Sequence, residues 1–311
     1  MNSNITLSIV IPVYNEVVVL PPFWQELNRI LDTLTIGYEI LFIDDGSQDD
    51  TWACIQQLAA QHAEIRGIRF TRNFGKEAAI LAGLEQARGL AVVVMDGDGQ
   101  HPPELLPKML QAWQQGYGLI VACKKERSND SFFARVCASL FAALMHRLSG
   151  LDLINSADYR LLDRKVVSAL LACPEKIRFF RGMTTWTGVE SYPIAFAVPG
   201  RLAGVSHWNN IGLVKMALHA LVSYSAKPLY YLFATGIFGL LVSVLLGFQA
   251  LYSWLSGIAV SGWTSLTLVI LIFGSANLLG LGLLGIYIGQ LFNEIKARPS
   301  YLVRETIPEI A

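Results

Sequence analysis

Two aspartates and a glutamine lie close together after an apolar run in the first third of the chain. Asp96 and Asp98 are separated by one glycine, and Gln100 follows two residues later. Their side-chain oxygens are hard ligands that suit Mg²⁺ or Mn²⁺ shared with substrate phosphates rather than held in an all-protein cage. The alternative is an ordinary acidic turn. We predict a divalent-cation site, at which Gly97 and Gly99 let the backbone approach the ligand closely.

A second acidic pair, Asp44 and Asp45, follows another apolar run. Two acidic clusters that lie beside each other repel unless a cation or a donor-rich ligand sits between them. A nucleoside diphosphate with its metal ion would satisfy both clusters. The second pair therefore favours the cation-and-phosphate interpretation over an acidic turn.

Short apolar runs alternate with stretches of helical periodicity through the N-terminal part of the chain. This alternation predicts an α/β domain whose mostly parallel sheet is covered by helices on both faces. Ligands of such sheets bind beyond the carboxyl ends of the strands, which is where both acidic clusters fall. The expected strands are 7–13, 38–43, 65–70, 91–95 and 119–122, and the expected helices are 19–34, 51–62, 77–88 and 102–115.

Charged residues are distributed unevenly along the chain. There are 24 basic and 24 acidic residues, yet positions 228–293 contain no Asp, Glu, Lys, Arg or His. A membrane-spanning helix needs about 20 apolar residues, so this block predicts two spans, near 228–254 and 264–292. A buried helical hairpin in a soluble protein is the alternative. The composition excludes disorder and a simple soluble enzyme, and the lack of a basic excess argues against nucleic-acid binding.

The residues around this block predict its orientation. Lys227 precedes the first expected span, and Lys296, Arg298 and Arg304 follow the second, whereas the connecting turn has no basic residue. The positive-inside rule therefore places both termini and the N-terminal domain in the cytoplasm. No cleavable signal peptide is expected at the N-terminus. The expected parts are a cytoplasmic domain over 1–227, two spans within 228–293 and a cytoplasmic tail over 294–311.

The second expected span is rich in glycine. Gly280, Gly282 and Gly285 match the GxGxxG pattern of dinucleotide-binding loops. That pattern has to follow a strand and open a helix, so we reject this interpretation. Gly285 and Gly289 form a GxxxG pair, which suits close helix packing and leaves homo-oligomerisation open.

Several motifs together resemble one protein family. They are IPVYNE at 11–16, IDDGS at 43–47, RNFGKEAAILAGL at 72–84 and VMDGDGQHPPE at 94–104, continued at 156–167, 178–182 and 201–208. This set is similar to the family 2 inverting glycosyltransferases, in particular the dolichol-phosphate mannose synthase-like branch, whose acceptor is a polyprenyl phosphate. The two apolar segments match the bacterial subgroup of that branch. The resemblance covers nearly the whole chain and implies a GT-A, Rossmann-like fold.

The resemblance also implies roles for individual residues. Asp158 matches the position usually proposed as the catalytic base. The implied ligands of the donor nucleotide are Pro12, Tyr14, Glu16, Asp44 and Asp96, those of the metal ion are Asp96, Asp98 and Gln100, and those of phosphate groups are Arg127, Arg135 and Arg201. Arg127 and Arg135 are expected at the phosphate of the acceptor.

General chemistry limits the role of Asp158 as a base. A phosphate monoester has a second pKa of about 6, so at neutral pH it is mostly a dianion and needs little deprotonation. Positioning and charge neutralisation then matter more than proton transfer. Asp158 could instead orient Arg160 or the acceptor, or form a structural salt bridge with Arg160. These alternatives stay open at the level of the sequence.

Two further segments, 131–148 and 211–224, have the pattern of amphipathic helices. Their apolar faces are expected either in the inner leaflet or against the domain core. On the bilayer, they would let a lipid phosphate reach the site while its tail stays in the membrane.

The expected activity is transfer of one hexose from a nucleotide sugar to undecaprenyl phosphate or a related carrier at a bacterial inner or plasma membrane. The resemblance implies UDP-glucose as the first choice of donor, and Mg²⁺ or Mn²⁺ as the cofactor. GDP-mannose and a modified UDP-pentose are alternative donors. Two other candidates are a processive polysaccharide synthase, whose Gln-x-x-Arg-Trp motif is absent from this sequence, and a noncatalytic membrane scaffold with a degenerate sugar-nucleotide domain.

Overall fold

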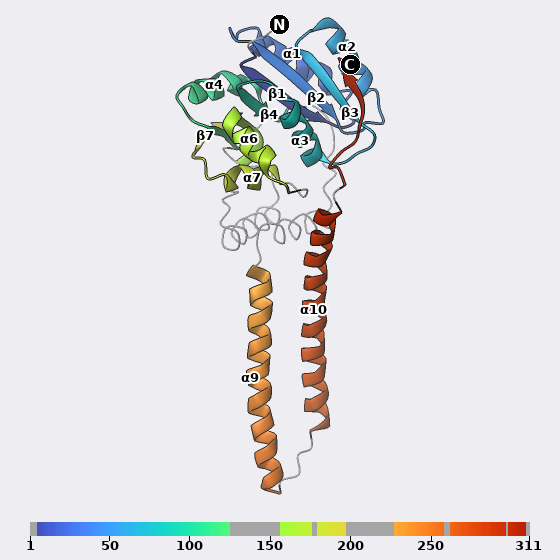
Figure 1. Cartoon of the computed structure of the whole chain (residues 1–311), viewed down its shortest axis with the longest axis vertical. Coiled ribbons are helices and arrows are strands. Elements are labelled where there is room, and N and C mark those ends of the chain that lie inside the picture. The colour runs from blue at the N-terminus through green and yellow to red at the C-terminus, as the bar shows by residue number, and fades with distance from the viewer. Residues whose placement is uncertain are drawn as a thin grey trace. The chain divides into compact units, whose positions relative to one another are not determined.

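The chain divides into two compact units, which are described separately. One comprises Met1–Asn209 and Arg298–Ala311, and the other comprises Asn210–Ala297. The computed structural model describes residues 5–124, 156–175, 179–196, 227–257, 262–296 and 298–308. Figure 1 shows the elements of both units.

The described strands of the first unit form one mixed sheet. They are β1 (Leu7–Val13), β2 (Tyr38–Asp44), β3 (Ile65–Phe70), β4 (Ala91–Val94), β5 (Leu119–Lys124), β6 (Ser156–Asp163), β7 (Ser191–Phe196) and β8 (Val303–Ile307). Their order is β7-β5-β6-β4-β1-β2-β3-β8. Strands β1 to β4 run parallel, β6 is antiparallel to β4 and β5, and β8 is antiparallel to β3. The central strand β1 is buried along its whole length, because LSIVIPV has an apolar side chain for nearly every position of both faces.

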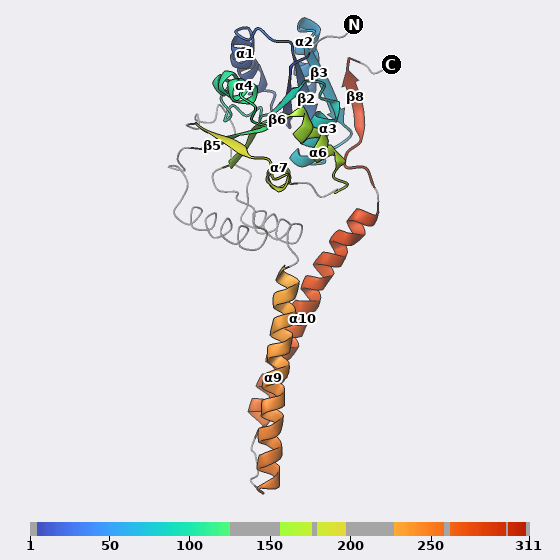
Figure 2. The ribbon, with the colours of Figure 1, turned by 60° about the vertical axis from the view of Figure 1, so that its left-hand side comes forward.

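Helices cover both faces of this sheet. They are α1 (Leu20–Leu31), α2 (Thr51–Gln61) and α4 (Leu106–Gln114), which follows the 3₁₀ turn η1 (Pro103–Leu105), and α3 (Lys76–Gln86), α6 (Arg164–Ala172) and α7 (Phe180–Trp186). Helices α1, α2 and α4 share a core with Ile9 and Ile11 of β1. Val10 points to the opposite face, where it meets Gly83 of α3. In Figure 2, α1 and α4 lie on one side of the strands and α3 and α6 on the other.

The predicted α/β class with a mostly parallel sheet is confirmed, and the five predicted strands lie where the apolar runs indicated. Strands β6, β7 and β8 were not predicted. Most residues of β7 and β8 are exposed or half-buried, so these strands lack the buried apolar run from which the other strands were predicted. Strand β8 lies in the segment that was expected to be a tail, 294–311, and it pairs there with β3 and forms the edge of the sheet.

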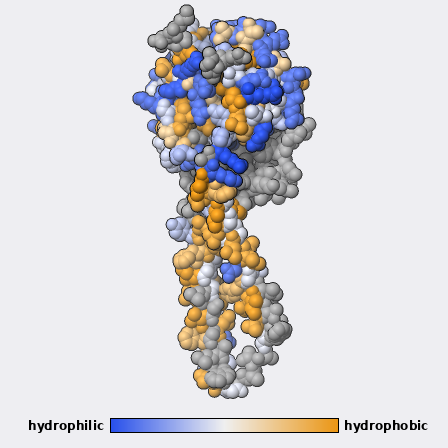
Figure 3. Space-filling view, turned by 45° about the vertical axis from the view of Figure 1, so that its right-hand side comes forward, coloured by the Kyte–Doolittle hydropathy of each residue, from blue (hydrophilic) through white to orange (hydrophobic). Residues whose placement is uncertain are grey.

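The second unit contains two long apolar helices, α9 (Lys227–Leu255, 29 residues) and α10 (Trp263–Ile295, 33 residues). Their most apolar windows, Leu229–Leu246 and Ile272–Gly289, are 6% buried. By length and composition, both helices can cross a membrane. Figure 3 shows that apolar side chains gather on this part of the chain. The helices coincide with the predicted spans and are slightly longer at each end.

One glycine of α10 serves a contact between the two helices. A Cβ on Gly280 would lie 3.0 Å from the side chain of Leu232 in α9. The GxGxxG match therefore lies inside a helix, where its first glycine allows close packing. A Cβ on Gly285 or Gly289 would meet no described atom within 4 Å, so this GxxxG pair is not used between α9 and α10.

Gly83 of α3 lies directly against β1, because a Cβ there would overlap Cγ1 of the buried Val10. We expect Gly83→Ala to destabilise the first unit by about 1–3 kcal/mol, since a branched, buried side chain cannot move aside. Thermal unfolding of the purified chain in detergent measures this loss. Val10→Ala opens the space, so the double variant should lose less than the sum of the single variants. Additive losses would contradict the proposed contact.

Candidate active site

The carboxyl ends of three parallel strands lie side by side. Val13 at the end of β1 pairs with Asp44 at the end of β2, and Val10 pairs with Val94 at the end of β4. Strand β6 enters this edge from the opposite direction. Its Arg160 pairs with Val94, so Asp158, two residues earlier, lies beyond the end of β4. The sheet therefore brings the predicted acidic residues of β2, β4 and β6 to one edge.

Asp45 shapes the loop that leads into α3. Its Oδ1 accepts a hydrogen bond from the N–H of Phe74 at 2.6 Å, and its Oδ2 accepts from the N–H of Gly75 at 2.9 Å. The N–H of Asp45 itself donates to the carbonyl oxygen of Val13. This carboxylate therefore fixes where α3 begins, and so where Lys76, its first residue, is placed.

Asp44, predicted to bind the nucleoside, is fully buried. Its Oδ1 accepts from the N–H of Ser47 at 2.9 Å, and its Oδ2 lies 3.3 Å from Nε of Arg69. The contact with Arg69 is an ion pair without hydrogen-bond alignment, since neither atom has a hydrogen-bond partner among the described residues. Burial raises the pKa of Asp44, and the bonds from Ser47 and the charge of Arg69 oppose that rise.

The loop after β1 carries other predicted donor ligands. Pro12 lies inside β1 opposite Ile43, and Tyr14, just past the strand, is 40% exposed. Asn15 has a φ of 53°, in the left-handed region, and its N–H donates to Oγ of Ser47 at 2.9 Å. The bond joins the loop after β1 to the loop after β2.

Glu16 is the most perturbed carboxyl group of this loop. Its Oε2 lies against Gly97, where a Cβ would approach it to 2.9 Å, and it has no hydrogen-bond partner in the described part of the chain. Burial, followed by repulsion from Asp98 and Asp96, raises the pKa of Glu16 to about 8. The glycine between the two aspartates is therefore what lets a third carboxyl group come close.

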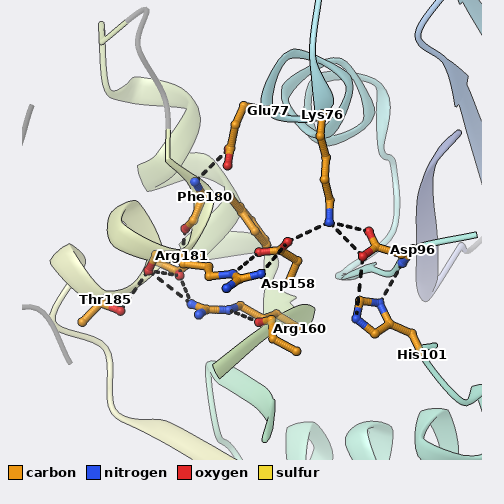
Figure 4. A network of polar contacts seen from close by, with 11 residues as sticks. Lys76, Glu77, Asp96, His101, Asp158, Arg160, Phe180, Arg181 and Thr185 are labelled. Carbon is orange, nitrogen blue, oxygen red and sulfur yellow. Dashed lines mark hydrogen bonds and ion pairs between the residues drawn. The ribbon is translucent and has the colours of Figure 1, made fainter. Parts of the chain in front are cut away.

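Lys76 joins two carboxylates, one from the loop after β4 and one from β6 (Figure 4). Its Nζ lies 2.6 Å from Oδ1 of Asp96 and 2.7 Å from Oδ2 of Asp158. Burial alone would lower the pKa of Lys76, but Asp96 and Asp158 outweigh it and raise that pKa above its usual range. The ammonium group is therefore charged at neutral pH and ties the region after β4 to the start of β6.

A buried histidine holds the backbone of Asp96. The N–H of Asp96 donates to Nδ1 of His101 at 2.8 Å, and the imidazole stacks on Tyr159 at 5.1 Å between ring centroids. Burial lowers the pKa of His101, which favours the neutral ring that this acceptor nitrogen requires. Beyond it, Oδ1 of Asp98 accepts from the N–H of Gln100 at 2.9 Å.

Asp158 lies between two cations. Besides Lys76, Arg181 of α7 donates to both of its oxygens, with Nη2 3.0 Å from Oδ2. Burial opposes ionisation, but Lys76 and Arg181 outweigh it and hold the pKa of Asp158 well below its usual range. A general base works best when its pKa lies near the working pH, so this carboxylate is poorly suited to remove a proton.

The alternative of a salt bridge between Asp158 and Arg160 is wrong, because the Arg160 side chain turns elsewhere. The buried guanidinium donates to the carbonyl oxygens of Ala157 at 3.1 Å and Arg181 at 3.4 Å, and to the hydroxyl of Thr184. Burial lowers the pKa of Arg160 to about 10, so it is still a cation at neutral pH. Arg160 therefore supports the backbone of β6 and α7.

Glu77 follows Lys76 and turns toward α7, as Figure 4 shows. Its Oε2 accepts from the N–H of Phe180 at 2.8 Å. Burial raises the pKa of Glu77 to about 7, opposed by this hydrogen bond and by Lys76 and Arg181. The carboxyl group lines a small cavity whose other walls are apolar: Ile80, Leu81, Leu84, Leu170, Phe180 and Met183.

The predicted cation ligands have suitable chemistry but do not form a cage. Asp96 and Asp98 offer carboxylate oxygens at one strand end, and Oε2 of Glu16 is an orphaned buried oxygen beside them. Among the described residues, no three His, Cys, Asp or Glu side chains converge with metal-binding geometry. Mg²⁺ typically binds one or two carboxylates and completes its shell with waters and substrate phosphates. The residues present fit that mode of binding.

Sequence reasoning gave no role to several residues that the site uses. Lys76, Glu77, His101 and Arg181 stand inside or next to the quoted motifs, but no spacing rule singles them out. One pattern could have indicated Lys76. This residue starts a helix directly after a glycine, and the start of a helix that follows a parallel strand lies at the edge of the sheet where ligands bind. Other predictions lie outside the described residues, namely Arg127, Arg135, Arg201 and the amphipathic segments 131–148 and 211–224.

The fold is of the GT-A type. Among solved structures, the glucosyl-3-phosphoglycerate synthase of Mycobacterium tuberculosis, in complex with Mn²⁺, UDP-glucose and phosphoglyceric acid, matches with a TM-score of 0.52. The match covers 70% of this chain and 77% of that one at 19% identity, which establishes the shared fold. The chain matches the model of glycosyl transferase family 2 over residues 8–171, and it belongs to this family.

Relatives align over nearly the whole chain. A putative glycosyltransferase, CsbB of Bacillus subtilis, is 38% identical over 301 residues, covering 96% of this chain and 91% of that protein. The SfII prophage-derived bactoprenol glucosyl transferase of Shigella flexneri is 35% identical over 302 residues, covering 96% and 98%. The similarity therefore includes the two apolar helices as well as the sheet domain.

The raised pKa of Glu77 predicts a pH-dependent term in stability. A carboxyl group whose folded-state pKa of about 7 exceeds its usual 4.5 stabilises the fold fully only below the lower value, and loses this contribution as pH rises through the higher one. Glu77→Gln keeps an acceptor for Phe180 but cannot ionise. It should therefore be more stable than the wild type at pH 8, by up to about 3 kcal/mol, and nearly equal to it at pH 4.

Thermal unfolding across this pH range measures the difference. Glu190→Gln, which changes an exposed carboxyl group, is the matched control and should track the wild type. A gap between Glu77→Gln and the wild type that stays constant with pH would show that Glu77 does not titrate in this range.

Proposed function

We propose that the protein transfers a single sugar, glucose from UDP-glucose, to a polyprenyl phosphate such as undecaprenyl phosphate. The observation that carries this proposal is that Lys76 contacts both Asp96 and Asp158. Asp96 belongs to the aspartate pair predicted to bind the metal ion, and Asp158 also contacts a second cation, Arg181. Relatives named bactoprenol glucosyl transferase, similar over nearly the whole chain, support the lipid acceptor and the sugar. We propose that the reaction takes place at the cytoplasmic face of a bacterial inner or plasma membrane.

The nucleotide sugar is proposed to lie over the carboxyl ends of β1, β2 and β4. The base and ribose pocket is assigned to Pro12, Tyr14, Glu16 and Asp44, and the binding of Mg²⁺ or Mn²⁺ is assigned to Asp96, Asp98 and Gln100. When bound, the metal ion neutralises negative charge on the diphosphate. Before the metal ion binds, burial and the charges of Asp98 and Asp96 raise the pKa of Glu16 to about 8 and favour its protonated form, which adds no negative charge to the site.

The chemical step needs little help from a base. A phosphate oxygen of the acceptor attacks the anomeric carbon while the bond from that carbon to the diphosphate oxygen breaks. UDP leaves with the bonding electrons, and the configuration at the carbon inverts. The attacking phosphate is mostly a dianion at neutral pH. We therefore assign Asp158 the role of orienting Lys76 and Arg181, in place of the base role that the family resemblance implies.

The two apolar helices are proposed to anchor this unit in the membrane. The basic residues that flank them support cytoplasmic termini and a cytoplasmic catalytic unit. The acceptor phosphate is assigned to Arg127 and Arg135, and another phosphate contact to Arg201. Segments 131–148 and 211–224 are proposed to lie at the bilayer surface. An anchored unit can meet the lipid phosphate without extracting the lipid tail, which would be costly to expose to water.

Incubation of the purified chain with undecaprenyl phosphate, Mg²⁺ or Mn²⁺ and a panel of labelled nucleotide sugars tests the activity. Label from UDP-glucose should enter the lipid phase, and EDTA should abolish the transfer. Asp98→Asn should lower the rate by about 100-fold or more, because it removes a charged ligand of the metal ion. Asp32→Asn, on the exposed end of α1, is the control and should not change it.

The same panel decides between the rival functions. Transfer from GDP-mannose or a UDP-pentose in place of UDP-glucose would replace the proposed donor. Absence of turnover with every nucleotide sugar would favour the noncatalytic scaffold. Label in a growing polymer rather than in a single lipid-linked sugar would favour a polysaccharide synthase.

The pH dependence of Asp158→Ala separates positioning from base catalysis. If Asp158 orients the cations, the variant should stay severely impaired at every pH from 6 to 9, because deprotonation of the phosphate does not restore the position of Arg181. If Asp158 is the base, activity should recover as pH rises above the phosphate pKa of about 6. Rates at saturating donor and acceptor measure the effect, and recovery at high pH would refute the positioning role.

A further inference from the structure

Three cationic side chains surround Asp158. Lys76 and Arg181 contact its carboxylate, and the buried Arg160 lies beside them with only neutral acceptors: two carbonyl oxygens and a hydroxyl. Lys76 shares its charge with Asp96. Another carboxyl group that interacts with these residues, Glu77, has a pKa of about 7 and is therefore only partly ionised at neutral pH. Among the described residues, positive charge thus exceeds negative charge on the α7 side of Asp158.

One side of the Arg181 guanidinium makes no hydrogen bond within the described part of the chain. Its Nε and Nη2 donate to the two oxygens of Asp158, whereas Nη1 has no partner among the described residues. The side chain is 38% exposed and that of Lys76 is 40% exposed, so both can be reached from solvent. A guanidinium held on one side by a carboxylate is pre-organised to bind a second oxyanion on its other side, because its donors are fixed in one plane.

We propose that Arg181, held by Asp158 and assisted by Lys76, forms an anion subsite for the phosphate group of the acceptor. The proposal rests on the proposed transferase activity and names a residue of the acceptor site from the described part of the chain. Asp158 is then a positioning residue, which directs Arg181 and Lys76 without touching the phosphate itself.

The position of Arg181 favours the acceptor phosphate over the diphosphate of the donor. Figure 4 shows Asp96 and Arg181 on opposite sides of Asp158, with Lys76 reaching between the two carboxylates. Asp96 belongs to the proposed metal and diphosphate side. An inverting displacement needs the attacking and leaving oxygens on opposite faces of the anomeric carbon. The proposed metal ion on the Asp96 side and Arg181 on the other side of Asp158 would hold the leaving and the attacking oxygens apart in this way.

Binding of farnesyl phosphate, a short-chain polyprenyl phosphate, to the full chain in detergent tests the subsite by titration calorimetry. Arg181→Ala should weaken binding about 10-fold or more, as expected for loss of a charge-assisted hydrogen bond, and should leave UDP binding with Mn²⁺ within about 2-fold. In the transfer assay, KM for the acceptor should rise while KM for the donor stays unchanged. The control is Arg29→Ala, which removes another arginine–carboxylate pair, the one with Glu104, and should change neither affinity.

A second variant keeps the test decisive if Arg181→Ala does not fold. Arg181→Lys preserves the charge, but an ammonium cannot contact Asp158 and a phosphate with a two-sided planar fork. It should melt at the wild-type temperature and bind farnesyl phosphate several-fold more weakly. Unchanged farnesyl phosphate affinity in a folded Arg181 variant would overturn the proposal. Weaker UDP binding with unchanged farnesyl phosphate binding would assign the subsite to the donor and overturn it as well.

The calorimetric measurement also separates this proposal from the proposed activity. Binding requires no turnover, so a chain that transfers no sugar but loses farnesyl phosphate binding in Arg181→Ala would keep the subsite and reject the activity. Transfer to lipid with unchanged acceptor affinity and KM in the variant would keep the activity and reject the subsite.

Discussion

The site depends on one ammonium group placed between two carboxylates. Strands β4 and β6 run in opposite directions, so the end of β4 and the start of β6 lie at the same edge of the sheet. This pairing brings Asp96 and Asp158 together although both are negatively charged. Two carboxylates at such an edge repel, and Lys76 cancels that repulsion by contacting both. Its position is fixed in turn by Asp45, whose oxygens bind the N–H groups just before α3. A carboxylate that binds backbone N–H groups therefore sets the place of Lys76, and the Lys76 ion pairs then set the place of the two carboxylates.

Environment divides the acidic residues of this edge into two groups. Burial dominates at Glu16 and Glu77 and raises their pKa values to about 8 and about 7. Direct cation contacts dominate at Asp158 and lower its pKa. Carboxyl groups of similar intrinsic pKa thus stay partly or largely protonated, or stay ionised, near neutral pH, according to their contacts. A permanent anion can hold arginine and lysine side chains in place, which supports the positioning role proposed for Asp158.

The sequence was sufficient for features that local patterns encode. Strands β1 to β5 and helices α9 and α10 follow from apolar runs, and the placement of Asp96 follows from the general rule for parallel sheets. Pairing at the site was not predictable in this way. Arg160 was considered for Asp158 because it is two residues away, whereas the actual partners are 82 and 23 residues away in Lys76 and Arg181. Strand β8 was missed because it has no apolar run, and it is a strand because its backbone pairs with β3 at the edge of the sheet.

Strand β8 changes how the chain after α10 should be understood. It returns to the edge of the sheet, where Glu305 accepts a hydrogen bond from Nε1 of Trp52 at 2.8 Å and lies 3.6 Å from Nη1 of Arg69. Arg69 also faces the buried Asp44. A polar chain of contacts therefore runs from the segment that follows the second apolar helix to a residue assigned to the donor. Because Arg69 is shared between two carboxylates, the charge balance at Asp44 depends on this C-terminal strand, which is consequently part of the catalytic unit and not a dispensable tail.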